Sequence, residues 1–248
     1  KLSHLNPYII EGYITGCCST NNYEDANDYI KSIGLTKDNA LRFGEISSSL
    51  CTMVAAILER TTNDIKEELS WNFLANKLNP DNSPIRWNLS LSQLKNGQIE
   101  VGANNYEARF NCKEFVSPIK KFRKPKWNKN ITNDSKILLW YEQGIGDELR
   151  FLSALPFFIE DFPNVIIEPS DKLLGLLQNS FSKLEVRESV FYEGYTDQKE
   201  DFDYHLPMGS MFYYVVEKYK DKFQEKDFSL LESFLEADHL RVNYWKNK

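Results

Sequence analysis

The residues with the clearest capacity for chemistry lie in one short loop at positions 142–147, with the sequence Glu-Gln-Gly-Ile-Gly-Asp. The loop follows an apolar run and precedes a helical pattern, and ligands of open α/β sheets bind just beyond the carboxyl ends of the strands. Gly144 and Gly146 are expected to permit a tight turn and a close approach to a ligand, because a Cβ atom clashes at positive φ. Asp147 fits two roles equally well, an active-site carboxylate and the N-cap of the helix.

Signatures of other chemistries are weak in this sequence. The loop lacks the third glycine of a dinucleotide fingerprint and the Lys-Ser/Thr of a P-loop. The cysteines at 17, 18, 51 and 112 and the three histidines lack the spacing of zinc ligands, and reduced cysteines in a cytoplasmic protein are expected. His205 lies near an expected strand end, where it either lines a cleft or is a hydrogen-bonded structural residue.

The elements that must position this loop alternate between strand and helix. Strands are predicted at 136–141, 164–168, 183–187 and 201–206, and helices at 148–158 and 171–179. Such alternation predicts a parallel sheet with right-handed crossovers and helices on its faces. Helical periodicity returns at 228–248.

The first half of the chain has a different periodicity, with apolar residues recurring at three and four positions. Helices are predicted at 22–33, 41–58, 65–78, 84–94 and 99–110, with Gly34 ending the first and Asn96-Gly97 forming a turn. Between the halves, the segment 118–135 is basic and rich in proline, which is typical of a linker. An anion or nucleic-acid contact is the alternative role of this segment, and Trp127 is expected to pack it onto a domain. We therefore expect a helical domain at 1–117, a linker at 118–135 and an α/β domain at 136–248.

Composition narrows the partners of the protein. The 248 residues are 42% hydrophobic and carry a formal net charge of −6, which is globular and gives no general attraction for nucleic acid or an anionic membrane. The longest apolar run, Leu50 to Leu58, is far shorter than the roughly 20 residues that cross a bilayer, so no membrane span is expected.

Part of the helical half resembles a tetratricopeptide repeat. In such a repeat, Pro closes one unit, and the next has an early aromatic residue, a turn at Gly and a late aromatic residue. The corresponding residues here are Asn79-Pro80-Asp81-Asn82, Trp87-Asn88-Leu89, Gly97 and Tyr106. The match is partial, since Ser90 replaces the usual Gly and Gly102 the usual Ala. A plain helical bundle is the alternative.

The segment 140–156, Trp-Tyr-Glu-Gln-Gly-Ile-Gly-Asp-Glu-Leu-Arg-Phe-Leu-Ser-Ala-Leu-Pro, resembles the strand-loop-helix that opens the glycosyltransferase-like domain of bacterial repeat-bearing proteins related to family 9 heptosyltransferases. Similar stretches occur at 106–109, 125–127, 202–210 and 235–245, so the resemblance runs from about residue 79 to the end. It implies a Rossmann-like domain that forms the N-terminal half of a GT-B type glycosyltransferase. Asp147 aligns with the general base of the heptosyltransferases.

This resemblance implies transfer of a sugar from a nucleotide-sugar donor to a protein or glycan acceptor, with no metal or other cofactor. A base of this kind needs a carboxylate within reach of the attacking oxygen. Glu142, Gln143, Gly144, Gly146 and His205 are the substrate-contact candidates, although Glu142 and Gln143 fit loop anchoring equally. The donor-binding second domain is expected outside these 248 residues, so the fragment alone is not expected to catalyse transfer. The alternatives are a non-catalytic module that binds a protein on its helical repeats, and a chain that self-assembles over its exposed sheet edge.

Overall fold

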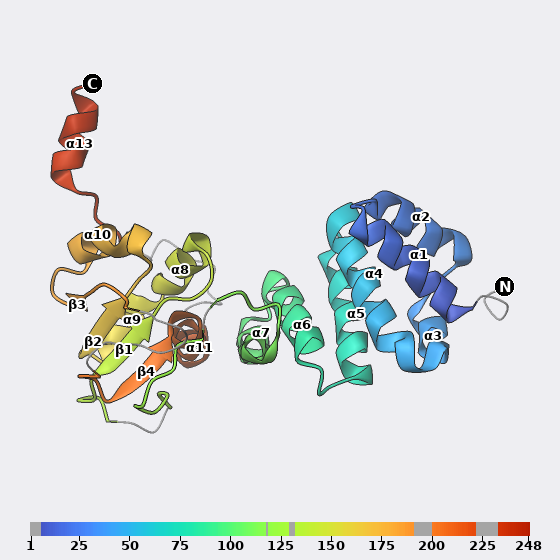
Figure 1. Cartoon of the computed structure of the whole chain (residues 1–248), viewed down its shortest axis with the longest axis horizontal. Coiled ribbons are helices and arrows are strands. Elements are labelled where there is room, and N and C mark those ends of the chain that lie inside the picture. Colours follow the sequence, from blue (N-terminus) through green and yellow to red (C-terminus); the bar gives the residue numbers. More distant parts are fainter. Residues whose placement is uncertain (1–5, 118, 129–131, 191–199, 222–232) are drawn as a thin grey trace. The chain divides into compact units, whose positions relative to one another are not determined.

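The computed structural model describes residues 6–117, 119–128, 132–190, 200–221 and 233–248 (Figure 1). The chain is mostly helical with one small parallel sheet, so it has an α + α/β organisation. It divides into two compact units, Lys1–Phe115 and Val116–Lys248.

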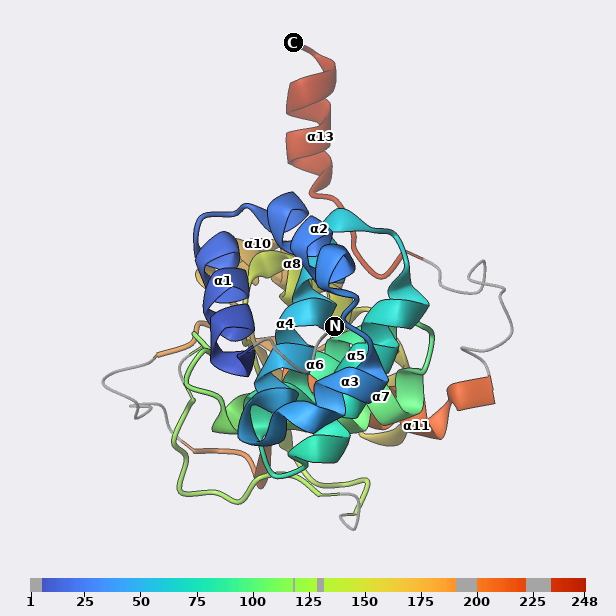
Figure 2. The same ribbon diagram turned by 90° about the vertical axis from the view of Figure 1, so that its right-hand side faces the viewer.

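The first unit is entirely helical in the residues described. Its elements are α1 (Pro7–Ser19), α2 (Tyr23–Ile33), α3 (Lys37–Ala40), the 3₁₀ helix η2 (Leu41–Ile46), α4 (Ser47–Thr61), α5 (Ile65–Leu78), α6 (Ser83–Lys95), α7 (Ile99–Tyr106) and the 3₁₀ helix η3 (Glu107–Asn111). Helix α4 packs against both α2 and α5 (Figure 2). One buried cluster, which includes Ile14, Leu50 and Trp71, joins α1 to α6.

Local signals in the sequence fix most of these helix ends. Asp64 Oδ1 accepts a hydrogen bond from Glu67 N at 3.0 Å and caps α5, whose bounds match the predicted 65–78. Gly34 ends α2 in the left-handed region with φ 66°, as predicted, and Gly97 has φ 72° in the predicted turn. The prediction of one helix over 41–58 is wrong at its start, because Gly44 has φ 64° and ψ −128° and breaks the helix there.

One helical stretch in the described residues, Lys37–Thr61, is long and apolar enough to cross a membrane. It contains the break at Gly44, and five residues of α4 within it belong to the hydrophobic core of the unit. Because core helices pass the same test of length and composition, this stretch is weak evidence for a membrane span.

The second unit contains a parallel sheet with the strand order β3-β2-β1-β4. The strands are β1 (Ile137–Trp140), β2 (Val165–Glu168), β3 (Glu185–Val186) and β4 (Tyr204–Pro207), and the helices are α8 (Ile145–Leu152), α9 (Leu155–Asp161), α10 (Asp171–Ser180), α11 (Met208–Lys218) and α13 (His239–Lys246). The parallel sheet is confirmed. Helix α13 projects away from the sheet and has no buried residue (Figures 1 and 2).

Two helices differ from the predictions for this unit. The predicted helix 148–158 is wrong as a single element, because Pro156 stands in the first turn of α9 and cannot continue a preceding helix. Helix α11 was not predicted. The predicted C-terminal helical stretch is described only in part, since residues 228–232 lie outside the described residues.

The basic segment packs closely on the second unit where the structure describes it, at 119–128. Phe122 packs against the buried cluster of Leu138, Ile166 and Phe202 on the sheet. Trp127 is 8% exposed and contacts the rings of Phe158, Phe162 and Tyr214, which confirms the packing predicted for it. The backbone of 125–127 also pairs with His205, so this segment covers the outer edge of β4.

Candidate functional site

The loop between β1 and α8 makes its tight turn at Gln143. Gln143 has φ 63°, and its backbone N–H donates to Ser117 Oγ. Gly144 is the N-cap of α8 with φ −85°, and Gly146 lies inside the helix. The expectation that these glycines provide a positive φ is therefore wrong, because the turn is completed one residue earlier.

Glu142 anchors this loop within the α/β unit. Glu142 is fully buried, and its Oε1 accepts a hydrogen bond at 2.8 Å from the backbone N–H of Gly209, in the first turn of α11. A carboxylate is favoured at a helix N-terminus, where backbone N–H groups are unpaired and the helix dipole is positive. The geometry thus corresponds to the anchoring role of Glu142.

Glu148 plays the same part for α10. It is 1% exposed, and its Oε1 accepts a hydrogen bond from Ser170 N at 2.9 Å, at the N-cap of α10. Burial raises the pKa of this carboxyl, and hydrogen bonds from Ser170 partly offset that effect. Glu148 was not among the candidates from the sequence. The one sequence signal for its burial is its spacing from Phe151 and Leu152, which places it on the apolar face of α8.

Asp147 differs from both neighbouring carboxylates. It is the third residue of α8, so the N-cap role is wrong for it, and no side chain caps the helix. Asp147 Oδ1 accepts a hydrogen bond from Arg150 Nη2 at 3.1 Å, and the side chains are 38% and 50% exposed. Among the three carboxylates of this loop and helix, Asp147 is the one that a dissolved substrate can reach.

His205 lies within β4, opposite Leu138 of β1, and does not stand at the carboxyl end of the strand. Its Nδ1 accepts a hydrogen bond from Trp140 Nε1 at 3.3 Å, and the Phe122 ring lies 4.5 Å from its ring, centre to centre. Burial, with a smaller effect from Lys126, lowers the pKa of His205 to about 4. This arrangement is that of a structural histidine.

A buried ionic cluster lies at the carboxyl end of β2 and was not anticipated. Glu168 is fully buried, and its oxygens accept from Lys120 Nζ at 3.2 Å and from Arg187 Nε at 3.1 Å. Arg187 also binds Asp201 at 2.9 Å and holds the pKa of that carboxyl below its usual range. Burial lowers the pKa of Lys120, although Glu168 opposes this shift. The one sequence signal for this cluster was the predicted apolar strand at 164–168, which ends in Glu168. A carboxylate buried at the end of such a strand requires a cation as its partner.

The described residues contain no group of three or more His, Cys, Asp or Glu side chains that could hold a metal ion. All four cysteines are free thiols. The accessible chemistry of the loop is therefore that of one carboxylate, Asp147, beside the uncapped N-terminus of α8.

Comparison with known proteins gives one distant similarity. The chain is 27% identical to Protein FlbA of Caulobacter vibrioides over 166 residues, which cover 60% of this chain and 26% of FlbA. The chain thus spans about a quarter of the length of this curated relative. No family model matches the chain. No solved structure matches it either.

Proposed function

We propose that this chain is the acceptor-side half of a bacterial, cytoplasmic glycosyltransferase-like protein, in which tetratricopeptide-like repeats precede a Rossmann-like domain of GT-B type. Asp147 is the general base that accepts the proton of an acceptor hydroxyl while a sugar leaves its nucleotide. The helical unit holds the protein or glycan acceptor. A second α/β domain of the whole protein completes the donor site, so the chain alone does not catalyse transfer.

The observation that carries this proposal is the difference between Asp147 and its neighbours. Glu142 and Glu148 are buried and accept hydrogen bonds from the N-termini of α11 and α10. These contacts fix the loop and leave Asp147 partly exposed beyond the carboxyl end of β1. A base that acts on a dissolved acceptor needs this kind of access, together with a rigid loop that holds it in place.

The first turn of α8 supports the same assignment. Residues 144–146 are exposed and no side chain caps the helix, so the unpaired N–H groups of this turn favour negative charge nearby. An acceptor oxygen that loses its proton to Asp147 develops such a charge. Arg150 Nη2 donates to Asp147 Oδ1 at 3.1 Å and orients the carboxylate.

The proposal is tested with the full-length parent protein and a panel of nucleotide sugars, by measuring sugar transfer and donor hydrolysis. Asp147→Asn keeps the size of the side chain and removes the base, and losing the exposed pair with Arg150 costs at most about 1 kcal/mol of stability. Glu160→Gln, at an exposed position on α9, is the matched control. Equal activity of Asp147→Asn and the wild type would remove the base assignment.

A second candidate function, a non-catalytic module that binds a protein, has its own supporting observation. A small cavity of about 80 Å³ opens between α4, α5 and α6, and Leu91 at its edge is 39% exposed. Asn72, which also lines the cavity, has a buried Oδ1 without a hydrogen-bond partner in the described structure. If this surface holds a partner, Leu91→Lys abolishes pull-down of that partner by the chain. Leu41→Lys, on η2 and 47% exposed, leaves the pull-down intact.

A further inference from the structure

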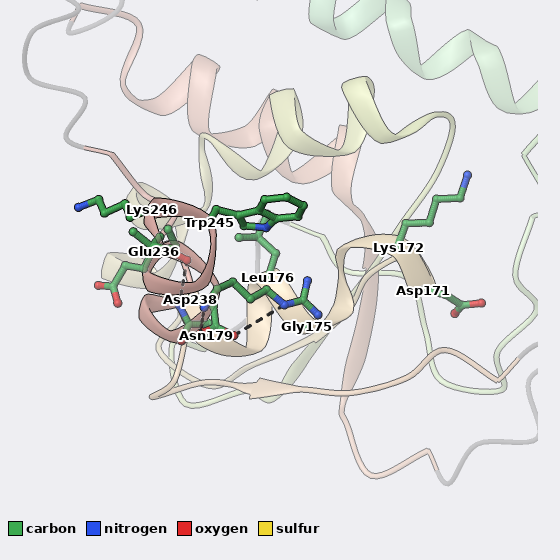
Figure 3. Close-up of a pocket in the computed structure, with 12 residues that line it drawn as sticks. Asp171, Lys172, Gly175, Leu176, Asn179, Glu236, Asp238, Trp245 and Lys246 are labelled. Carbon is green, nitrogen blue, oxygen red and sulfur yellow. Dashed lines mark hydrogen bonds and ion pairs between the residues drawn. The ribbon is translucent and has the colours of Figure 1, made fainter. Parts of the chain in front are cut away.

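The cavity of about 80 Å³ on the helical unit, between α4, α5 and α6, has an uneven charge. Among the described residues that line it, two are carboxylates, Glu59 and Glu68, and none is a cation. The larger groove between α10 and the segment 236–246, of about 810 Å³, is lined by three carboxylates and three cations, and its two lysines lie at opposite ends (Figure 3). The charge of the small cavity therefore favours a cation, whereas that of the groove favours neither sign.

A buried acceptor in the small cavity lacks a donor. Asn72 lines the cavity and is 5% exposed. Its Nδ2 donates to Ser92 Oγ at 2.7 Å, and Ser92 Oγ donates to Glu68 Oε1 at 2.7 Å. A carboxylate only accepts, so it takes the hydroxyl hydrogen of Ser92, and Ser92 can then only accept from Asn72. This chain of bonds fixes the orientation of the amide and leaves its Oδ1, which is buried and has no hydrogen-bond partner in the described structure, for a donor in the cavity.

Lys95 neutralises only part of the negative charge. Its ammonium group forms a close ion pair with Glu59 and lies 3.4 Å from Glu68 Oε1. One ammonium beside two carboxylates leaves one negative charge without compensation. Lys95 also leaves Asn72 Oδ1 without a donor. A ligand that completes this site thus carries a positive charge together with N–H groups.

The shape of the cavity favours the side chain of arginine. Its acceptors lie on two helices, with Glu59 on α4 and with Glu68 and Asn72 one turn apart on the same face of α5. A guanidinium has five N–H donors spread in one plane and is more weakly hydrated than an ammonium, so it suits separated acceptors in a partly buried site. Since about 10 to 15 Å³ holds one water molecule, the cavity has room for such a group. Ala56 and Leu91, both exposed, supply an apolar rim for the aliphatic stem.

We infer that this cavity binds an arginine side chain of a protein partner, whose guanidinium donates to Asn72 Oδ1 and lies against Glu59 and Glu68. The inference deepens the proposed function and rests on it in one respect, the assignment of this partner as the protein acceptor held by the helical unit.

Binding is measured by NMR titration of the ¹⁵N-labelled 248-residue chain with the peptide acetyl-Gly-Ala-Arg-Ala-Gly-amide. Saturable shifts of the side-chain amide signals of Asn72 and Asn88, which both line the cavity, are expected with a dissociation constant of about 1 mM or lower. A peptide with citrulline in place of arginine keeps the shape and removes the charge. It is expected to bind about 10- to 100-fold more weakly, because charge-assisted hydrogen bonds are lost.

Two pairs of variants test the site without disturbing the core. Ala56→Leu fills the rim of the cavity from an exposed position and abolishes binding, whereas Ser48→Leu, about two turns earlier on α4 and outside the lining, leaves it unchanged. Glu59→Gln removes one carboxylate and weakens binding by about 3- to 5-fold. Glu45→Gln, at an exposed position on η2 that does not line the cavity, has no effect.

Three outcomes would overturn the inference. They are the absence of saturable shifts up to about 10 mM peptide, equal binding of the arginine and citrulline peptides, and equal binding of the arginine peptide and its lysine counterpart. None of them involves sugar transfer, so none bears on Asp147. In the full-length protein, Ala56→Leu raises the KM for an arginine-bearing protein acceptor at unchanged kcat, whereas Asp147→Asn lowers kcat. Peptide binding with an unchanged acceptor KM in Ala56→Leu would keep the arginine site and overturn its assignment to the acceptor.

Discussion

Mild acid is expected to destabilise the α/β unit through His205. The imidazole is partly buried beside Phe122, and its Nδ1 accepts the indole N–H of Trp140 at 3.3 Å. Protonation places a second N–H against that donor and puts a charge in an apolar environment. The ring therefore remains neutral in the folded protein down to a pKa of about 4, compared with 6.5 in the unfolded chain.

The stability of the α/β unit depends on pH because His205 has different pKa values in the folded and unfolded chains. Between pH 6.5 and pH 4 the unfolded chain binds the proton that the folded chain refuses, so stability falls as the pH falls through this window. A difference of this size lowers the free energy of unfolding by about 2 kcal/mol at pH 5 relative to pH 8, and by about 3 kcal/mol below pH 4. Above pH 6.5 His205 is neutral in both states and contributes no pH dependence.

The assay is hydrogen exchange of peptides from β1 and β4 as a function of urea, at pH 7.5 and pH 5.0, after correction for intrinsic exchange. His205→Asn keeps an acceptor close to the position of Nδ1 and removes the titration. The variant is expected to lose about 2 kcal/mol less than the wild type between the two pH values. His239→Asn, at an exposed position on α13, is the control and should behave as the wild type does. Identical losses in the wild type and His205→Asn would refute this reasoning.

Three further predictions concern packing and buried charge. A Cβ at Gly102 would lie 3.0 Å from Leu94 Cγ, so Gly102→Ala destabilises the helical unit by about 1 kcal/mol in urea unfolding. Gly16 has free space around it, so Gly16→Ala stabilises the unit by about 0.5 to 1 kcal/mol in the same measurement. A stabilising Gly102→Ala would contradict the close packing of α6 on α7. Glu142→Ala leaves Gly209 N without its acceptor and costs about 2 to 3 kcal/mol by the same measurement, and an unchanged unfolding midpoint would show that this bond does not anchor the loop. Lys120→Met costs about 3 kcal/mol alone, and the added Glu168→Met recovers part of the loss, so strictly additive effects in the double-mutant cycle would exclude a coupled pair.

Elements with a local signal were predicted closely from the sequence. The Asp64 cap and the periodicity from Ile65 gave α5 its bounds, and the apolar run at 136–141 gave β1. The strand predicted at 164–168 and the helix at 171–179 differ from the structure by one residue at an end. Such signals act over one or two turns, so they are visible in a single sequence.

Features that depend on long-range contacts were not predictable in this way. Helix α11 begins at Met208 directly after β4, and its N-terminus is satisfied by Glu142, which is 67 residues away from Gly209. Lys120 and Glu168 meet across 48 residues, and no local pattern identifies the partner. In the candidate site, the loop sequence was enough to identify Asp147 as a candidate. The difference in exposure between Asp147 and the buried Glu148 could be seen only in the folded structure. The left-handed turn at Gln143 also arises from a distant contact, the hydrogen bond to Ser117.

The central claim, that Asp147 is the general base of a glycosyl transfer, is tested most directly by the kcat of the full-length protein and its Asp147→Asn variant with a nucleotide-sugar donor at pH 7. Loss of a general base lowers the rate by about 10²- to 10⁴-fold, and this loss is expected in kcat with little change in stability. A variant that transfers sugar at the wild-type rate would contradict the account.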